Sequence, residues 1–100
     1  MILYNVTINI DTQVEVEWLQ WMKDTHIPNV LETGLFTDYK IYKILAEEPQ
    51  GRSYSIQYFT KSLEDINEYQ EKYAPALRDE VMQKYGKHLV AFRTMLESVD

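Results

Sequence analysis

His26 is the residue of this sequence best suited to acid–base chemistry, and it stands in the aromatic segment WLQWMKDTHIPNVLETGL (18–35). A histidine titrates near neutral pH, so its ring can act as a general base or bind a ligand in a cleft. The structural alternative is a ring that caps a helix break before Pro28 by donating to a backbone carbonyl. We favour this alternative, because spacing fixes no second acid–base group and helical geometry turns Asp24 away from His26.

The aromatic residues of the same segment also allow two interpretations. Trp18, Trp21 and Met22 could wall a pocket for a flat apolar ligand. Aromatic residues at helical spacing more often belong to a core, and we prefer that interpretation. The chain holds eight tyrosines as well. Their hydroxyls need partners when buried, so some of them can mark the mouth of a pocket.

Other catalytic and metal-binding patterns are absent from the sequence. There is no cysteine, no H-x-x-x-H pair, no glycine-rich phosphate loop and no nucleophile elbow. His26 and His88 stand far apart in the chain, and the acidic residues between positions 64 and 71 are typical of a solvated helix face. We therefore predict no metal site and no cofactor.

Length and charge limit the classes of partner. One hundred residues correspond to one domain, which we assign to residues 1–100. The net charge of −6 argues against nucleic acid, and the ten basic residues are too scattered to form a patch for anionic lipid. No apolar run approaches the ~20 residues of a membrane helix, and no signal-peptide pattern follows Met1. We expect a cytoplasmic protein with neither nucleic acid nor membrane as a partner.

The strands are predicted from alternation. Apolar and polar residues alternate over residues 1–10, which predicts a strand packed against helices. Strands over 38–45 and 52–60 flank a turn at 47–51 and form an antiparallel hairpin. A last strand is predicted over 88–99.

The first predicted helix carries an apolar stripe that includes Trp18. Thr12 and Glu15 form a capping box at its start. Pro28 disfavours helical geometry at the residue before it and opens a second short turn. Gly34 can adopt the left-handed conformation that closes this turn.

The second predicted helix begins where Ser62 and Asp65 form a capping signal. Pro75 predicts a kink or break near Tyr73, and Gly86 ends the helix. One buried stripe is expected to contain Ile66, Tyr69, Tyr73, Leu77, Val81 and Tyr85.

The element order βαββαβ predicts an α+β, ferredoxin-like fold, a four-stranded antiparallel sheet with two helices on one face. Facing the helices we place Ile2, Tyr4, Val6, Ile8, Ile10, Tyr54, Ile56, Tyr58, Val90, Phe92 and Leu96. The helix-free face then carries Leu3, Asn5, Thr7, Gln57, Phe59, Arg93 and Met95.

The helix-free face has the composition of an interface, because it mixes apolar groups with amides and is poor in Lys and Glu. We predict a homodimer through this face, which also protects the exposed sheet edges. Asn5, Gln57 and Arg93 are expected to form hydrogen bonds in the dimer core, since an unpaired buried polar group costs about 1–3 kcal/mol.

Several motifs together resemble a small bacterial domain family of unknown function. They are W-x-x-W-M-K-x-x-H-I-P-x-V (18–30), QYF (57–59), Y-A-P-x-L-R (73–78) and AFRT (91–94). That family is similar to the dimeric α/β-barrel superfamily, in which two ferredoxin-like protomers face their sheets together. The superfamily includes antibiotic-type and haem-degrading monooxygenases and lactone isomerases. The haem-degrading members use an Asn, Trp and His set. This chain departs from it, because no tryptophan lies on the third strand.

The resemblance implies a ligand site between the helices and the sheet, usually for a small molecule. We place it under the first helix, where the helix break loosens the cover, and expect a small apolar or aromatic ligand. Its predicted walls are Trp18, Met22, His26, Tyr4 and Tyr58. The preferred function is a small-molecule binding or interaction module without catalysis. The alternative is a cofactor-independent monooxygenase or isomerase that uses His26 in the helix–sheet cleft.

Overall fold

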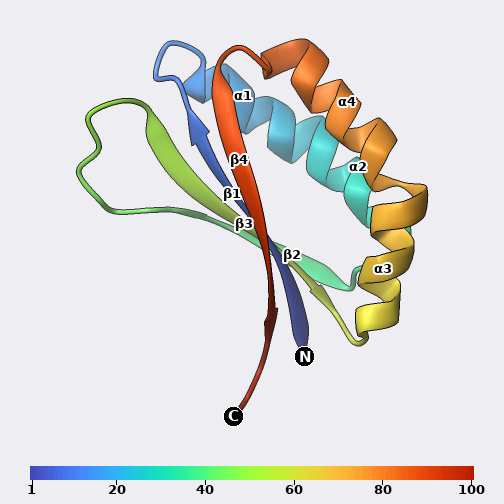
Figure 1. The fold of residues 1–100 in the computed structure, drawn as a ribbon. Coiled ribbons are helices and arrows are strands. Elements are labelled where there is room, and N and C mark those ends of the chain that lie inside the picture. The colour runs from blue at the N-terminus through green and yellow to red at the C-terminus, as the bar shows by residue number, and fades with distance from the viewer.

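The alternating residues at the start of the chain form strand β1 (Ile2–Ile10), an inner strand of the sheet. The computed structural model describes residues 1–100, and its four strands form an antiparallel sheet in the order β2-β3-β1-β4 (Figure 1). Strand β2 (Asp38–Lys43) pairs with β3 (Arg52–Thr60), which confirms the predicted hairpin. Strand β4 (Leu89–Glu97) pairs with the other side of β1. Both edge strands are slightly shorter than predicted.

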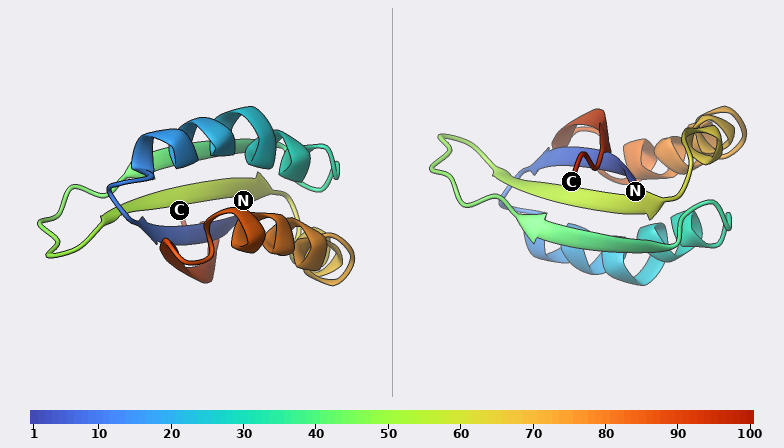
Figure 2. Two further views of the ribbon diagram at one scale, coloured as in Figure 1. Left: turned by 90° about the horizontal axis from the view of Figure 1, so that it is seen from above. Right: turned by 90° about the horizontal axis from the view of Figure 1, so that it is seen from below.

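Helices cover one face of this sheet only. The first helical segment consists of α1 (Glu15–Trp21), the π-helix η1 (Met22–His26) and α2 (Ile27–Leu31). The second consists of α3 (Leu63–Lys72) and α4 (Ala74–Tyr85). Seen from above, the helices lie in front of the sheet, and seen from below, the strands lie in front of the helices (Figure 2). The predicted ferredoxin-like arrangement is therefore confirmed.

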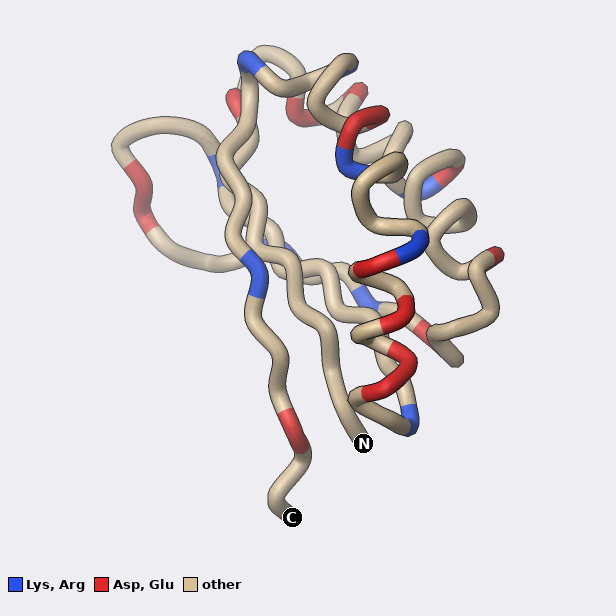
Figure 3. Tube along the Cα trace, turned by 45° about the vertical axis from the view of Figure 1, so that its right-hand side comes forward, with Lys and Arg blue, Asp and Glu red and all other residues tan.

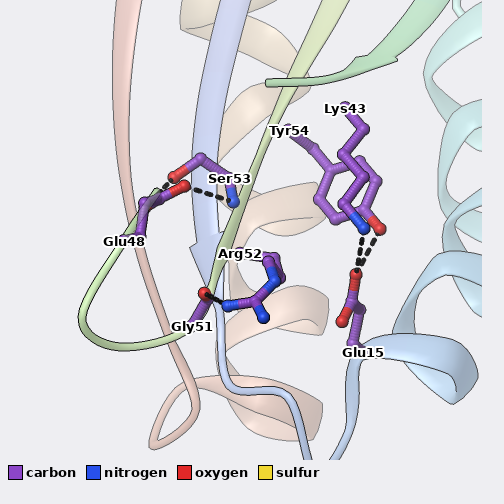
Figure 4. A network of polar contacts seen from close by, with 7 residues as sticks. All are labelled: Glu15, Lys43, Glu48, Gly51, Arg52, Ser53 and Tyr54. Carbon is purple, nitrogen blue, oxygen red and sulfur yellow. Dashed lines mark hydrogen bonds and ion pairs between the residues drawn. The ribbon is translucent and has the colours of Figure 1, made fainter. Parts of the chain in front are cut away.

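The first helix begins without the predicted capping box. Val14 is its N-cap, and no side chain bonds to the free amides there. The Glu15 carboxylate instead accepts a hydrogen bond from the Tyr54 hydroxyl and lies 3.7 Å from Nζ of Lys43 (Figure 4). Burial, followed by this hydrogen bond, raises the pKa of Tyr54 to about 12, so the phenol keeps its proton. Because the sheet holds the carboxylate, Glu15 does not turn back to cap the helix.

The predicted helix break at residues 26–28 is a π turn. The amide of Ile27 donates to the carbonyl of Met22, five residues earlier. Pro28 has no amide hydrogen, so a regular helical bond would be missing here in any case, and the chain adopts a wider turn. The helix continues to Leu31, and Gly34 then adopts the expected positive φ of 78°.

The second helical segment follows the prediction at its ends. The amide of Asp65 donates to Oγ of Ser62 at 3.2 Å, which confirms the N-cap. Tyr73 has a φ of −120° and separates α3 from α4, so the break predicted from Pro75 is also confirmed. The Tyr73 side chain is 37% exposed and leaves the predicted buried stripe, because the helix is interrupted at this residue.

The predicted faces of β4 are wrong. Arg93 lies opposite Val6 and therefore faces the helices, whereas Phe92 lies opposite Thr7 on the helix-free face. The helix face of β4 carries Leu89, Ala91, Arg93 and Met95, and the helix-free face carries Val90, Phe92 and Leu96. The prediction placed the bulkier apolar side chains of this strand against the helices. In the structure β4 instead borders a cavity on that side, and the small Ala91 and the long Arg93 leave the cavity open. A shift of one residue in phase exchanges every side chain of a strand.

The buried core lies between the sheet and the helices, with Trp18, Tyr4 and Ile10 among its largest fully buried side chains. Charged residues of both signs are spread over the molecule, and several acidic residues lie along α3 itself (Figure 3). None of the helices combines the length and apolar character needed to span a membrane.

Candidate functional site

A cavity of about 370 Å³ lies between the helices and the side of the sheet that contains β1 and β4. Twelve of its 15 lining residues are apolar or aromatic: Tyr4, Val6, Ile8, Met22, Ile56, Tyr58, Tyr69, Val81, Met82, Leu89, Val90 and Ala91. The other three are His26, Arg78 and Arg93. An apolar chamber therefore contains three nitrogen-bearing side chains, and none of the 16 acidic residues of the chain lines it.

The mouth of the cavity lies between α4 and β4. Met82 on α4 and Arg93 on β4 both line the cavity, and both are exposed, Met82 to 54%. Tyr4 and Tyr58 line the buried part of the cavity, each 2% exposed. A ligand that enters past α4 would thus meet solvent at one end and an aromatic floor at the other.

His26 enters the cavity from the π turn. Its ring stacks on Trp21 with 5.6 Å between the ring centroids and 23° between the planes. Its Nδ1 is buried without a hydrogen-bond partner, and the ring caps no helix end. The preferred capping role is therefore wrong, because the helix runs through this position. Burial, and next the positive charge of Arg93, lower the pKa of His26 from 6.5 to about 4, so the imidazole is neutral at neutral pH.

Two arginines bring positive charge to the cavity. Arg78 on α4 donates from Nη2 to the Tyr4 hydroxyl at 3.3 Å and to Oε1 of Gln70 at 2.6 Å. Its Nε is buried and has no partner. Arg93 on β4 makes no salt bridge, and neither does Arg78. Both guanidinium groups thus lack a carboxylate partner, although guanidinium is the group that binds carboxylates most readily in proteins.

The aromatic floor supplies hydroxyl groups. The ring centroid of Tyr4 lies 6.2 Å from that of Tyr58 and 5.7 Å from that of Tyr69. Burial, and then the neighbouring Tyr69, raise the pKa of Tyr58 well above its usual value. Burial and Tyr4 also raise the pKa of Tyr69, against the opposing effect of Arg78 and Arg93. The phenols of Tyr58 and Tyr69 therefore stay protonated and are available as hydrogen-bond donors.

The structure brings together four of the five predicted wall residues, Tyr4, Met22, His26 and Tyr58. Trp18 does not join them. Its side chain is fully buried and packs on Tyr54, with 5.2 Å between ring centroids, which agrees with the preferred interpretation of Trp18 as a core residue. Trp18 precedes η1 on the helix and faces the part of the sheet nearest β3, away from the cavity.

Sequence reasoning missed the contribution of the second helix and the last strand. Arg78, Val81 and Met82 on α4 and Ala91 and Arg93 on β4 all line the cavity. The i, i+3 and i, i+4 spacing among the α4 residues could have revealed them as one face. The β4 residues were missed because that strand was assigned the wrong phase.

The helix-free face carries a small polar network within an apolar surround. Asn5 donates to the Thr7 hydroxyl at 3.0 Å and accepts from the Ser55 hydroxyl at 2.6 Å, and Gln57 donates to Ser55 at 3.2 Å. Asn5 and Gln57 thus lie on the predicted face and form hydrogen bonds. Arg93 does not belong to this group, since it lies on the opposite face of the sheet.

The chemistry available to the cavity follows from these side chains. It can bury an apolar ring system, offer hydroxyl and guanidinium donors, and present one neutral imidazole. No group is positioned to orient that imidazole, because Nδ1 of His26 has no partner. The arrangement favours binding over acid–base catalysis, in which a base is usually held by a third group.

Residues 1–99 match the sequence profile of a family described as Domain of unknown function (DUF4286), so the chain belongs to that family. The predicted resemblance to a small family of unknown function with a ferredoxin-like fold is confirmed. Among curated proteins, none matches this chain.

Solved structures with the same fold come from several organisms. An EthD family protein from Bacillus halodurans has a TM-score of 0.68 at 16% identity, over 99% of this chain and 100% of that one. A dimeric ferredoxin-like protein from an uncultured marine organism has a TM-score of 0.71 at 14% identity, over 100% and 96%. SnoaB, a cofactor-independent oxygenase from Streptomyces nogalater, has a TM-score of 0.67 at 8% identity, over 99% and 94%. At these identities the likeness extends to the fold.

Proposed function

We propose that this member of the DUF4286 family is a cytoplasmic, homodimeric protein that binds a small apolar or aromatic molecule between its helices and its sheet. The observation that supports binding is the 370 Å³ cavity, whose walls are mainly apolar and whose few polar groups converge. Its volume falls at the lower end of the range of small-molecule pockets, about 300–1,000 Å³. A cysteine-free chain also folds without disulfides, as cytoplasmic proteins do.

The proposal of a dimer rests on the helix-free face. Val90, Phe92 and Leu96 of β4 lie on this face and are 70%, 63% and 45% exposed. Leu96 lies opposite Leu3 of β1, and Leu3 lies opposite Phe59 of β3, so these three side chains form an apolar row across the sheet. Exposed apolar side chains gathered on one face of a soluble protein mark an interaction site. The dimeric ferredoxin-like protein of similar fold supports a second copy of this chain as the partner.

Filling the cavity is expected to abolish ligand binding. Ala91 lines the cavity on β4, so Ala91→Phe places an aromatic ring in the space of the ligand. With 2-naphthamide as a neutral two-ring probe, calorimetric titration should give binding to the wild type and at least a tenfold loss of affinity in Ala91→Phe. Ala76→Phe adds the same ring on an exposed position of α4 and should bind the probe as the wild type does. Equal binding by both variants would contradict the proposed site.

A second candidate function is cofactor-independent oxygenation or isomerisation in the same cavity. The neutral imidazole of His26 beside the charge of Arg93 favours it, because a base and a cation together promote removal of a proton from an acidic carbon. In such a step the C–H proton moves to the imidazole and the electron pair forms an enolate. The similar fold of a cofactor-independent oxygenase is consistent with this chemistry.

Hydrogen exchange in a bound ketone tests this second function. In heavy water, a catalytic His26 would exchange the acidic C1 hydrogens of 2-tetralone faster than buffer does, and His26→Gln would lose that acceleration. We expect no more than a threefold acceleration by the wild type, because Nδ1 of His26 lacks an orienting partner. Proton NMR measures the exchange rate. An acceleration of a hundredfold or more that depends on His26 would favour catalysis over binding.

A further inference from the structure

The positive charges of the cavity have no counter-charge within the protein. The chain contains three arginines, and two of them, Arg78 and Arg93, line the cavity. Both salt bridges of the chain lie elsewhere, at Lys43 and at His88. The partners of Arg78 are a phenol and an amide, which are neutral, and its buried Nε is left without a partner.

The two guanidinium groups act on the same region of the cavity. Both line the cavity, both oppose the rise that burial causes in the pKa of Tyr69, and Arg93 also contributes to lowering the pKa of His26. Like charges that line one apolar site repel each other, and the desolvation of the half-buried Arg78 is unfavourable unless an anion compensates it. In a protein of net charge −6, carboxylates are abundant, yet none lies at this site. An anion supplied from outside would compensate this charge.

We infer that the ligand is an apolar or aromatic molecule that carries an anionic oxygen group, a carboxylate or an enolate, bound by Arg78 and Arg93. This inference rests on the proposed function, since it names the chemical class of ligand for the same cavity. The rings of the ligand pack between Met22 and the aromatic floor of Tyr4 and Tyr58. Its anionic group lies between α4 and β4, where a planar guanidinium can pair with two oxygens at once.

A pair of probes of similar shape, one anionic and one neutral, tests the inference. At pH 7.5, 2-naphthoate carries a carboxylate where 2-naphthamide carries a neutral amide of similar shape. We expect calorimetric titration of the wild type to give at least tenfold tighter binding of 2-naphthoate. Arg93→Gln should reduce this preference several-fold, and the double variant Arg78→Gln with Arg93→Gln should bring it within twofold of unity. Arg93→Lys keeps the positive charge but lacks the planar guanidinium group, so it should retain part of the preference for 2-naphthoate.

Arg52→Gln is the matched control, because it removes the third arginine, which lies on β3 outside the cavity. It should leave the preference for 2-naphthoate unchanged. Unaltered binding of 2-naphthamide by the arginine variants would show that their cavity is intact. Arg93 is exposed, so Arg93→Gln is expected to fold even if the double variant does not.

Two results would overturn the inference. One is equal affinity of the wild type for the two probes, and the other is a preference for 2-naphthoate that survives Arg93→Gln undiminished. Both outcomes would leave the cavity as a binding site and would reject only the anionic ligand. If the wild type bound neither probe, the proposed binding function itself would fail.

Discussion

Replacing Phe92 by glutamate is expected to convert a particle of twice 11.9 kDa into one of 11.9 kDa. Phe92 lies on β4 opposite Thr7, at the helix-free face, and 63% of its side chain is exposed in the single chain. In the proposed dimer it is buried against the second sheet. A carboxylate buried there without a partner costs about 4 kcal/mol, which weakens association roughly a thousandfold. Light scattering or sedimentation over about 1 to 100 µM protein measures the mass, because dimerisation depends on concentration.

The matched control is Val16→Glu, which introduces the same charge at a position of α1 that is 83% exposed. Val16 lies in the first helix, on the opposite side of the sheet from the proposed interface. This variant should keep the mass of the wild type. A wild type of 11.9 kDa at micromolar concentration, or a dimer that survives Phe92→Glu, would contradict pairing through this face.

The same apolar face explains why β4 was the element that sequence reasoning placed incorrectly. An edge strand that borders a cavity on one side and the proposed dimer interface on the other is expected to carry apolar residues on both sides. Leu89 and Met95 face the helices while Phe92 and Leu96 face away, so hydrophobicity does not distinguish the two faces. Strand β1 posed no such problem, because its helix-free side carries amides and a hydroxyl. Alternation therefore determined the phase of β1 correctly.

Local signals predicted the boundaries of the second helix well. Ser62 and Pro75 act through their own backbone and side-chain chemistry, which depends little on the rest of the fold. Glu15 shows the opposite case. Its carboxylate could cap its own helix or bond to Tyr54, and only the packed sheet decides between these partners. A capping signal in the sequence therefore loses to a tertiary hydrogen bond.

The candidate site was predicted only in part, because local patterns reveal some of its residues and the packed fold reveals the others. The four predicted wall residues that line the cavity come from β1, β3 and the first helical segment, whose apolar periodicity is clear. Arg78 was not found, because an arginine on an amphipathic helix ordinarily points to solvent. Only the assembled fold shows that its guanidinium reaches Tyr4 and that no carboxylate is near.

Acidification is expected to destabilise the protein through His26. The pKa of this ring is about 4 in the folded protein and 6.5 when unfolded, so the unfolded chain binds the proton first. The free energy of unfolding therefore falls as the pH decreases from 6.5 to 4 and is unaffected by this group above 6.5. A shift of this size corresponds to a loss on the order of 3 kcal/mol at pH 4, relative to pH 7. In His26→Gln this loss should be absent.

Urea unfolding at a series of pH values gives the required free energies, and the difference between wild type and variant isolates His26 from the titrating carboxylates. His26→Gln should gain stability relative to the wild type as the pH falls from 6.5 to 4. His88→Gln is the control, because it removes the other histidine, which bonds to Asp11 at 3.1 Å outside the cavity. A wild type and a His26→Gln variant with parallel pH profiles would show that the ring is not held neutral. Saturating 2-naphthoate should then diminish the difference between wild type and variant, because an anion beside Arg93 offsets the positive charge that lowers the pKa of His26.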